Sequence, residues 1–398
     1  MKAIPLVLVV AWSYSAFAQP DSTKWQTERS LELEIEHQYF PTSGSFPGQL
    51  DHFTSGAIRP RWSTRSPDKK HQIVLDAFLR GSLNDPLRSH FDFREAYYRY
   101  NNRKWALSVG AKKVFWGVTE SVHLVDIINQ ADQVEAFDGS EKLGQPMVQF
   151  TTSTSLGSFE FYYLPIARRR QFPGSHGRYR FPEVLAREDV PFTTSSNEWH
   201  PSAAARWYNT FNKLDVGLSY FYGVAREPMY LGFDPTIGLD LTYPIIHQIG
   251  LDAQYTAGAL MLKVEAINRL SERQDFVALA TGLEYTFGNI FGTGADVGVV
   301  SEYLYDSRGV LTFSGLDNDV FIGSRINLND VRGTSFLLGS IIDLERTTRL
   351  FRFEGSRRFK GNWKVDLLVS VLIDVSEEEI LFNFRQDDMV QLRISKFL

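Results

Sequence analysis

The chain contains no cysteine among its 398 residues. It therefore has no disulfide bond, no thiolate metal ligand, no thiol nucleophile and no residue at which a lipoprotein anchor is acylated. Acidic turns such as Asp317-Asn318-Asp319 and Asp387-Asp388 are present, but they lack the alternating series of oxygen ligands found in calcium-binding loops. We expect neither a cofactor nor a metal site.

Long apolar runs are also missing. The mean hydropathy is −0.21, and no stretch after residue 18 reaches the roughly 20 apolar residues that a membrane-spanning helix needs. A shorter run, Ala3 to Trp12, precedes the small-x-small sequence Ala16-Phe17-Ala18. This arrangement predicts a signal peptide over residues 1–18, removed on secretion, and an N-terminal extension over residues 19–29. A retained membrane anchor is disfavoured because the run is too short.

Excess charge and catalytic motifs are scarce. The chain has 42 lysines and arginines against 47 aspartates and glutamates, a formal net charge of −5, which gives no reason to expect a nucleic-acid partner. The eight histidines are scattered without any His-x-Ser or paired-His spacing. We therefore expect no enzymatic activity.

What the chain does have, from about residue 29 onward, is a repeated alternation of apolar and polar residues in stretches of about ten, each ended by a turn. In the stretch 294 to 306, one face carries Ala295, Val297, Val299, Tyr303 and Tyr305. The opposite faces carry charged residues, which a dry core does not bury without partners but a water-filled lumen accepts. The pattern predicts an all-β fold, a closed antiparallel transmembrane β-barrel over residues 30–398.

The spacing of these stretches predicts about eighteen strands, with sixteen as the alternative. Long connections then lie at one end and tight turns at the other, as in bacterial outer-membrane barrels. The stretch 54 to 63 is the weakest strand because it contains Pro60. We keep it because without it the long connection 114–146 would lie among the tight turns.

The predicted strands point charged residues of both signs into the lumen. These residues are Glu32, Glu34, Glu36, Asp76, Arg80, Lys263, Glu265, Arg269, Glu284, Glu302, Arg325 and Arg393. A barrel of this size is wide enough for an aqueous path. We expect small solutes inside it, with outer-membrane lipid and lipopolysaccharide around it.

The connection over residues 114–146 is too long for a turn and too apolar for a disordered segment. Its polar residues include Glu120, Asp126, Asn129, Asp132, Glu135, Asp138 and Glu141. We expect the loop to fold back into the lumen, pack its leucine and isoleucine residues on the inner wall and narrow the pore with its carboxylates. The alternative leaves it on the outer surface as a lid.

The next long connection, residues 167–199, is basic. It contains Arg168, Arg169, Arg170, Arg178 and Arg180. Two interpretations remain: a basic cluster that faces the acidic loop and sets up a transverse field, or an extracellular rim that pairs with lipopolysaccharide phosphates.

The last stretch alternates Val390, Leu392 and Ile394 with polar residues and ends in Phe397 and Leu398. It resembles the C-terminal signal that the barrel assembly machinery recognises, although that signal usually ends in phenylalanine. We expect this machinery as a partner during biogenesis.

Several segments together resemble a poorly characterised proteobacterial family of porin-like outer-membrane β-barrels. They are VGAKKVFWGVTESVHLVDIINQ, GLDAQYT, GLEYTF, SEYLYDSRG and RQDDMVQLRISKFL. The resemblance marks Trp116, Gly117, Asp126 and Asn129 as the matched positions of the inserted loop. It implies the barrel and the loop, but no catalytic or ligand residue.

The predicted function is a channel in the outer membrane of a Gram-negative cell for diffusion of small hydrophilic solutes. A modest cation preference is expected because six carboxylates in the connection 114–146 face one lysine. A gated transporter for hydrophobic compounds and a non-transporting envelope scaffold are the alternatives. An oligomer is possible, although no patch marks a subunit interface.

Overall fold

The computed structural model describes residues 23–185, 189–234 and 238–398. The predicted signal peptide lies outside these residues, as does the beginning of the predicted extension. Within them, no helix is long and apolar enough to cross a membrane. The helical segments that the structure describes are single short 3-10 turns: η1 Pro86–Arg88, η2 Asn197–Trp199, η3 Ile290–Gly292, η4 Gly309–Leu311 and η5 Ile380–Phe384.

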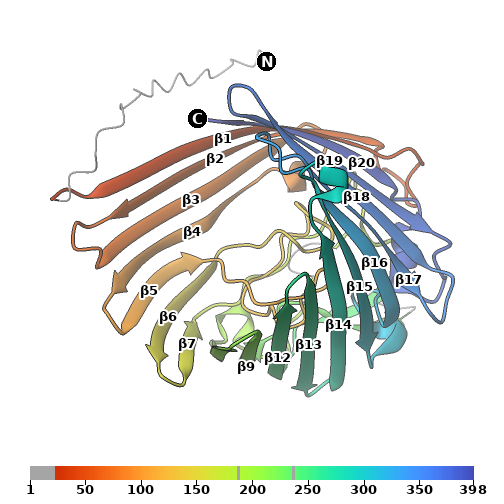
Figure 1. The fold of residues 1–398 in the computed structure, drawn as a ribbon. Helices are drawn as coiled ribbons and strands as arrows, with labels where there is room; N and C mark the ends of the chain where they lie inside the picture. Colours follow the sequence, from red (N-terminus) through yellow and green to blue (C-terminus); the bar gives the residue numbers. More distant parts are fainter. Residues whose placement is uncertain (1–22, 186–188, 235–237) are drawn as a thin grey trace, which may run out of the picture.

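Eighteen antiparallel strands form one closed sheet (Figure 1). They are β1 Gln26–Tyr39, β2 His52–Arg65, β3 His71–Ser82, β4 His90–Asn101, β5 Trp105–Lys112, β6 Gln145–Thr154, β7 Gly157–Leu164, β8 Ser202–Phe211, β9 Leu214–Val224, β12 Ile245–Ala257, β13 Leu260–Ser271, β14 Phe276–Phe287, β15 Asp296–Asp306, β16 Asn318–Asn327, β17 Ser335–Asp343, β18 Arg349–Phe359, β19 Trp363–Ile373 and β20 Met389–Phe397. The barrel closes where β1 pairs with β20, from Glu32 opposite Phe397 to Tyr39 opposite Val390. The predicted fold class is confirmed, and the sixteen-strand alternative is wrong.

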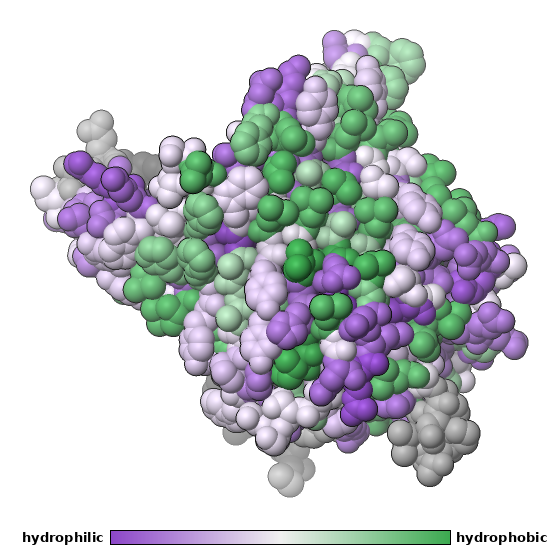
Figure 2. All heavy atoms as spheres, turned by 90° about the horizontal axis from the view of Figure 1, so that it is seen from below, coloured by the Kyte–Doolittle hydropathy of each residue, from purple (hydrophilic) through white to green (hydrophobic). Residues whose placement is uncertain are grey.

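Side chains along the strands alternate between the two faces of the wall. In β15, Val299, Tyr303 and Tyr305 are exposed on the outside, whereas Val300 and Glu302 between them are buried on the inside. Figure 2 shows apolar side chains over much of one outer face of the wall. An outward apolar face on a closed barrel, in which each strand is paired on both sides, is the arrangement that a bilayer requires.

The predicted strand that contains Pro60 is present as β2, and its pairing with the neighbouring strands shows how the sheet accommodates the proline. Pro60 lies opposite Leu31 of β1. On its other side the ladder with β3 passes from Ile58 to Arg61 without pairing the two residues between them. Proline has no backbone N–H to donate, so the sheet tolerates it at a local gap in the ladder.

The two ends of the barrel differ as expected from the spacing. One end has tight turns such as 212–213, where Asn212 takes a positive φ of 58°, and it is called the short-turn end below. The other, the long-loop end, carries the connections 113 to 144, 165 to 201, 225 to 244 and 374 to 388.

Some predicted boundaries need correction. β1 begins at Gln26, within the predicted extension 19–29, because Gln26 to Arg29 pair with the far end of β2. β6 begins at Gln145, so the predicted loop 114–146 ends two residues too late. The connection 225 to 244 holds a small hairpin that the alternation did not reveal, β10 Met229–Asp234 and β11 Gly238–Thr242.

Candidate functional site

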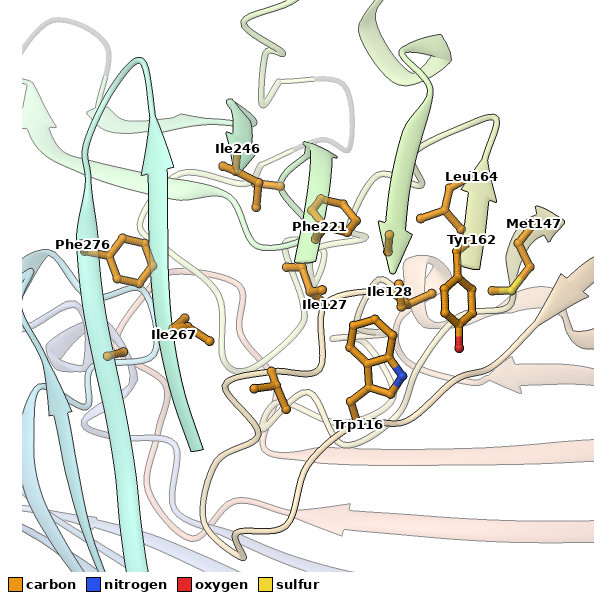
Figure 3. Packing of buried hydrophobic residues seen from close by; sticks show 14 residues of the cluster. Trp116, Ile127, Ile128, Met147, Tyr162, Leu164, Phe221, Ile246, Ile267 and Phe276 are labelled. Atoms are coloured by element: carbon orange, nitrogen blue, oxygen red, sulfur yellow. The ribbon is translucent and has the colours of Figure 1, made fainter. Parts of the chain in front are cut away.

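The connection between β5 and β6, residues 113 to 144, is called the lumen loop below. Trp116, Val125, Ile127 and Ile128 of this loop are at most 4% exposed. They pack against inward-facing side chains of the β6 to β14 wall, among them Phe221 (Figure 3). Burying an apolar side chain of this size contributes roughly 1.5–3 kcal/mol. The loop is therefore a packed part of the barrel interior, and its predicted position in the lumen is confirmed.

The first half of the lumen loop is held by Glu265 of β13, which is fully buried. Its Oε1 accepts hydrogen bonds from the backbone N–H groups of Val118 and Thr119 at 2.6 and 3.0 Å and from the Thr119 hydroxyl at 2.7 Å. Its Oε2 accepts one from the N–H of Val125 at 3.2 Å. A carboxylate is well suited to this task because its two oxygens accept several N–H groups at once.

Glu302 of β15 holds the next turn of the loop in the same way. Its oxygens accept hydrogen bonds from the N–H groups of Glu120 and Ser121 at 2.7 and 2.8 Å and from the Ser121 hydroxyl at 2.5 Å. The Glu120 carboxylate then pairs with Arg325 of β16 at 2.6 Å. Glu265 and Glu302, predicted simply to line the lumen, thus position the loop and are not free to meet a solute.

The second half of the loop returns to the opposite wall. Asp132 pairs with Arg94 of β4 at 2.6 Å and lies 3.2 Å from the ring nitrogen Nε2 of His90, and Glu135 pairs with Arg80 of β3 at 2.7 Å. Burial alone would raise the pKa of Asp132, but the hydrogen bond from His90 and the charge of Arg94 outweigh it and leave the pKa below its usual value. Burial raises the pKa of Glu135 even though Arg80 opposes the shift.

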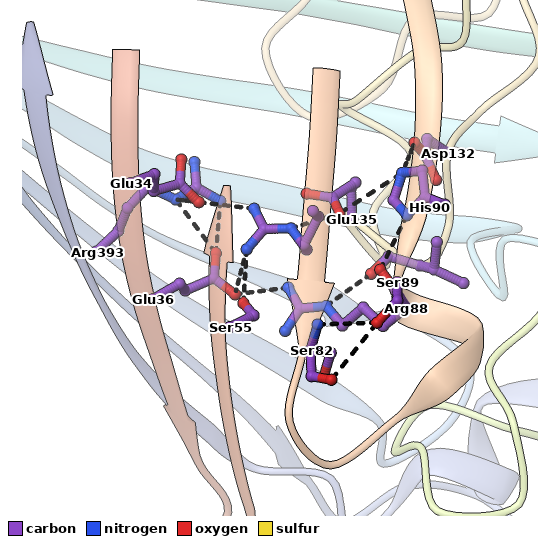
Figure 4. Close-up of polar contacts among 12 residues, drawn as sticks. Glu34, Glu36, Ser55, Ser82, Arg88, Ser89, His90, Asp132, Glu135 and Arg393 are labelled. Carbon is purple, nitrogen blue, oxygen red and sulfur yellow. Dashed lines mark hydrogen bonds and ion pairs between the residues drawn. The ribbon is translucent and has the colours of Figure 1, made fainter. Parts of the chain in front are cut away.

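Arg80 connects the loop to the seam of the barrel. Its guanidinium also pairs with Glu34 of β1 and donates to the Ser55 hydroxyl of β2, both at 2.6 Å. Next to it, Glu36 of β1 accepts from Arg88 at 2.5 Å and from Arg393 of β20 at 2.8 Å (Figure 4). Four of the predicted lumen charges therefore form one network across the junction between β1 and β20.

The other predicted lumen residues lie on the inner face in smaller groups. Asp76 accepts from Arg59 at 2.8 Å, and Lys263 pairs with Glu284 at 2.8 Å. Arg269 donates to Gln248 at 2.9 Å and lies over the ring of Phe276. Glu32 lines a small pocket beside Arg59 and Arg80.

Two residues of the lumen loop fix its base. The Asn129 amide donates to the carbonyls of Lys112 and Leu143 at 2.9 and 2.8 Å, and its oxygen accepts from the N–H of Val114 at 2.9 Å. Asp126 lies 3.3 Å from the Lys142 ammonium. Burial raises the pKa of Asp126, and Lys142 only partly offsets it.

The five arginines of the basic loop do not form one cluster. Arg168 pairs with Asp92 at 2.7 Å and Arg170 donates to Gln130 of the lumen loop, whereas Arg169 pairs with Glu198. Arg178 is almost wholly buried against Asp387 at 2.7 Å, and Arg180 donates to the backbone carbonyls of Phe181, Pro182 and Pro47. Both interpretations, a basic cluster that faces the acidic loop and an extracellular basic rim, are therefore wrong for Arg178 and Arg180, because both side chains are buried among loop partners.

The long-loop end is covered by a second apolar cluster. It joins the connections 165 to 201, 225 to 244, 307 to 317 and 374 to 388 through side chains such as Phe181, Tyr243, Phe313 and Phe384. These four connections are called the loop cap below. Arg178 and Arg180 belong to the polar edge of this cap.

A cavity of about 580 Å³ remains between the lumen loop and the wall formed by β16 to β20 and β1. The charged residues that line it are Asp85, Arg88, Glu120, Glu135, Asp138, Glu141, Arg178, Arg325, Arg352, Glu354, Lys364, Asp366 and Arg393. This space is called the pore cavity below. Asp138 of the loop pairs with Arg352 of β18 at 2.6 Å, and both side chains are more than 30% exposed.

The loop carboxylates face a wall with four basic groups. The alternation of their strands predicts that Arg325, Lys364 and Arg393 face the lumen, but Arg352 was not predicted there. The alternation of β18 does contain the signal, since Arg352 and Glu354 share one parity with inward-facing Ser356. Arg352 and Lys364 also pair with acidic neighbours on the wall, Glu354 at 2.6 Å and Asp366 at 2.8 Å.

The fold is similar to that of several solved structures. The chain superposes on OccK3 (OpdO) of Pseudomonas aeruginosa with a TM-score of 0.55 at 9% sequence identity, covering 94% of this chain and 95% of that one. OpdQ of the same organism gives 0.54 at 11% identity, covering 95% and 99%, and OccK11 (OpdR) gives 0.53 at 11% identity, covering 94% and 96%. No protein-family model and no curated protein sequence matches the chain. At these identities the likeness shows the fold.

Proposed function

We propose that the chain is a porin-like channel of the Gram-negative outer membrane through which small hydrophilic solutes diffuse. The closed barrel with its outward apolar face supports a membrane location. The long-loop end then faces the cell exterior and the short-turn end faces the periplasm, as in bacterial outer-membrane barrels. Removal of residues 1–18 as a signal peptide belongs to the same proposal.

The observation that carries the proposal is the charged lining of the pore cavity. Its acidic side is the lumen loop with Glu120, Asp138 and Glu141, and its basic side is the wall with Arg325 and Arg352. Glu120 and Asp138 are partly exposed and pair directly with Arg325 and Arg352 at the edge of the cavity. A dipolar or charged solute in the open space beside these pairs meets groups of both signs, which orient it.

A transporter for hydrophobic compounds has less support. The apolar cluster between the lumen loop and the β6 to β14 wall, which includes Phe221 and Phe276, does not line the pore cavity. The apolar residues that do line it, such as Phe137 and Phe336, lie among thirteen charged residues. An apolar solute would therefore meet charged groups that lose their water on its passage, which costs free energy. We infer that hydrophilic solutes are the better match.

A modest cation preference is the finer part of the proposal. Asp132 and Glu135, on which the prediction from sequence rested, are buried against arginines and contribute little to the field in the cavity. Without the buried Asp85, Arg88, Glu135 and Arg178, the lining still contains five carboxylates and four basic groups. The small excess of negative charge supports a weak preference for cations.

The test is a reversal potential in asymmetric KCl with the mature barrel in planar bilayers. We expect steady conductance with a weak cation preference, and a shift toward anions in Glu141→Gln, because Glu141 lines the cavity. Glu272→Gln, in an exposed turn at the long-loop end, is the matched control and should leave the reversal potential unchanged.

Two outcomes count against the proposal at different levels. Folded barrels that insert but never conduct overturn the channel. A conducting wild type that prefers anions leaves the channel in place and overturns the cation preference.

A further inference from the structure

Four carboxylates are buried together at the long-loop end of β16 and β17, apart from the lining of the pore cavity. Asp317 ends the connection before β16, Asp319 lies on β16, Asp343 ends β17, and Glu379 belongs to the connection before β20. Each is at most 6% exposed. Asp319 and Asp343 lie directly opposite each other in the β16–β17 ladder. Like charges in such a pair destabilise a sheet, so the cluster needs either a bound proton or positive charge.

Within the described residues, one basic side chain forms ion pairs with this cluster. The Arg346 atom Nη1 lies 3.0 and 3.1 Å from the two oxygens of Asp317 and 3.1 Å from Asp343. It lies 3.8 Å from Oε1 of Glu379, which is too far for a hydrogen bond. A single guanidinium thus faces four buried carboxylates, and two further acidic residues, Glu345 and Glu378, lie at 3.9 Å from it.

Two oxygens of the cluster have no hydrogen-bond partner in the part of the chain that the structure describes. They are Oε1 of Glu379 and Oδ2 of Asp319, both buried. The other Glu379 oxygen accepts from the Thr348 hydroxyl at 2.5 Å, so the unpartnered one is turned to the side of Arg346 and Asp343. Burying a carboxylate oxygen without a partner costs free energy, and a cation bound to that oxygen removes the cost.

The spacing of the cluster fits a cation. Ligand oxygens of Asp317, Asp343 and Glu379 all lie within 4.8 Å of one another. Two oxygens bound to one calcium ion at about 2.4 Å each are separated by at most about 4.8 Å, whereas magnesium, with bonds of about 2.1 Å, demands a tighter set.

We propose that Asp317, Asp343 and Glu379 bind a divalent cation of calcium's size, with Asp319 as a fourth carboxylate beside it. Arg346 swings out of the cluster when the ion enters. The ion ties together the connection before β16, the end of β17 and the connection 374 to 388. Two of these segments belong to the loop cap, so the site fastens the cap to the barrel wall. The sequence predicted no metal site because Asp343 and Glu379 are distant from the acidic turn at 317–319.

The site is tested by calorimetric titration of CaCl₂ into the full mature barrel, refolded in detergent free of lipopolysaccharide and treated with EDTA. Burial and the neighbouring Asp343 raise the pKa of Glu379 to about 7, so the titration is run at pH 8. We expect one site with a dissociation constant on the order of 10⁻⁴–10⁻³ M, the range of extracellular calcium modules. Asp343→Asn and Glu379→Gln should weaken binding by about tenfold or more, while Glu272→Gln should not change it.

A third variant, which should bind calcium more tightly, tests the proposal even if Asp343→Asn and Glu379→Gln fail to fold. Arg346→Gln removes the competing positive charge, so calcium binding should tighten by about tenfold. If Arg346 alone satisfies the carboxylates, this variant instead loses stability equally in calcium and in EDTA and gains no binding. That result, or a wild type that releases no heat with calcium, or binding that survives Asp343→Asn and Glu379→Gln, overturns the proposal.

Discussion

Arg94 and Asp132 form an ion pair of 2.6 Å inside the barrel, and each side chain is only 2% exposed. Arg94 lies on β4, and Asp132 lies in the second half of the lumen loop. The same guanidinium also lies 3.3 Å from the Lys142 carbonyl and from Asp92. The pair therefore fixes the returning half of the loop to the wall, and its loss leaves a buried positive charge with weaker partners.

Replacing Asp132 with asparagine should lower the free energy of unfolding by about 3–5 kcal/mol, because breaking a buried pair from one side leaves the partner uncompensated. Glu135→Gln is the matched control. Arg80 retains Glu34 and Ser55 in that variant, so a loss of about 1 kcal/mol is expected. Urea titration of refolded barrels measures both. If both variants lose the same free energy of unfolding, the partners that remain to Arg94 and Arg80 do not decide the cost of each substitution.

The same pair predicts a pH dependence. The folded-state pKa of Asp132 lies below its usual value, so the ionised carboxylate stabilises the fold at every pH above the unfolded pKa of about 3.9. That stability is lost as the pH falls further, through the folded pKa. Because His90 lies 3.2 Å from Asp132 and a histidine gains its charge between about pH 8 and 5, the comparison is made below that range. The difference in unfolding free energy between wild type and Asp132→Asn should shrink as the pH falls below about pH 4. A difference that does not shrink there would contradict the assignment.

Deleting residues 121 to 138 should raise single-channel conductance while the barrel still assembles. The removed segment contains no wall strand, and it lines one side of the pore cavity. It also removes Val125, Ile127 and Ile128 from the apolar cluster, so the deletion barrel should be less stable than the wild type. Unchanged conductance in a folded deletion variant would show that the loop does not limit the pore.

The alternation of the sequence was sufficient to predict the wall of the barrel. It placed Val299, Tyr303 and Tyr305 on the outer face because a strand exposes every second residue to the same side. The spacing of the connections also predicted that the stretch with Pro60 is a strand, because only then do the long connections lie at one end of the barrel.

The alternation could not predict which residues inside the lumen form hydrogen bonds and ion pairs with one another. The backbone of the lumen loop meets Glu265 about 140 residues further along the chain, and no local pattern marks a carboxylate as a backbone acceptor. Arg178 and Asp387 are 209 residues apart. Arg94 was not predicted for a different reason. It is the extra residue of a bulge in β4, because Asp76 and Ala77 of β3 pair with Glu95 and Phe93. The alternation of inward and outward side chains shifts by one residue at such a bulge.

The outer face can be tested at Val299, which is 41% exposed near the middle of β15. Val299→Arg should destabilise the barrel by roughly 2–4 kcal/mol if the side chain meets the centre of the bilayer, with less near the interfaces. Ser356→Arg is the matched control, because Ser356 lines the pore cavity and lies opposite Asp366; a new arginine there meets water and a carboxylate. Refolding yield and urea titration in lipid vesicles should separate the two variants. Equal tolerance of both would mean that Val299 does not face lipid.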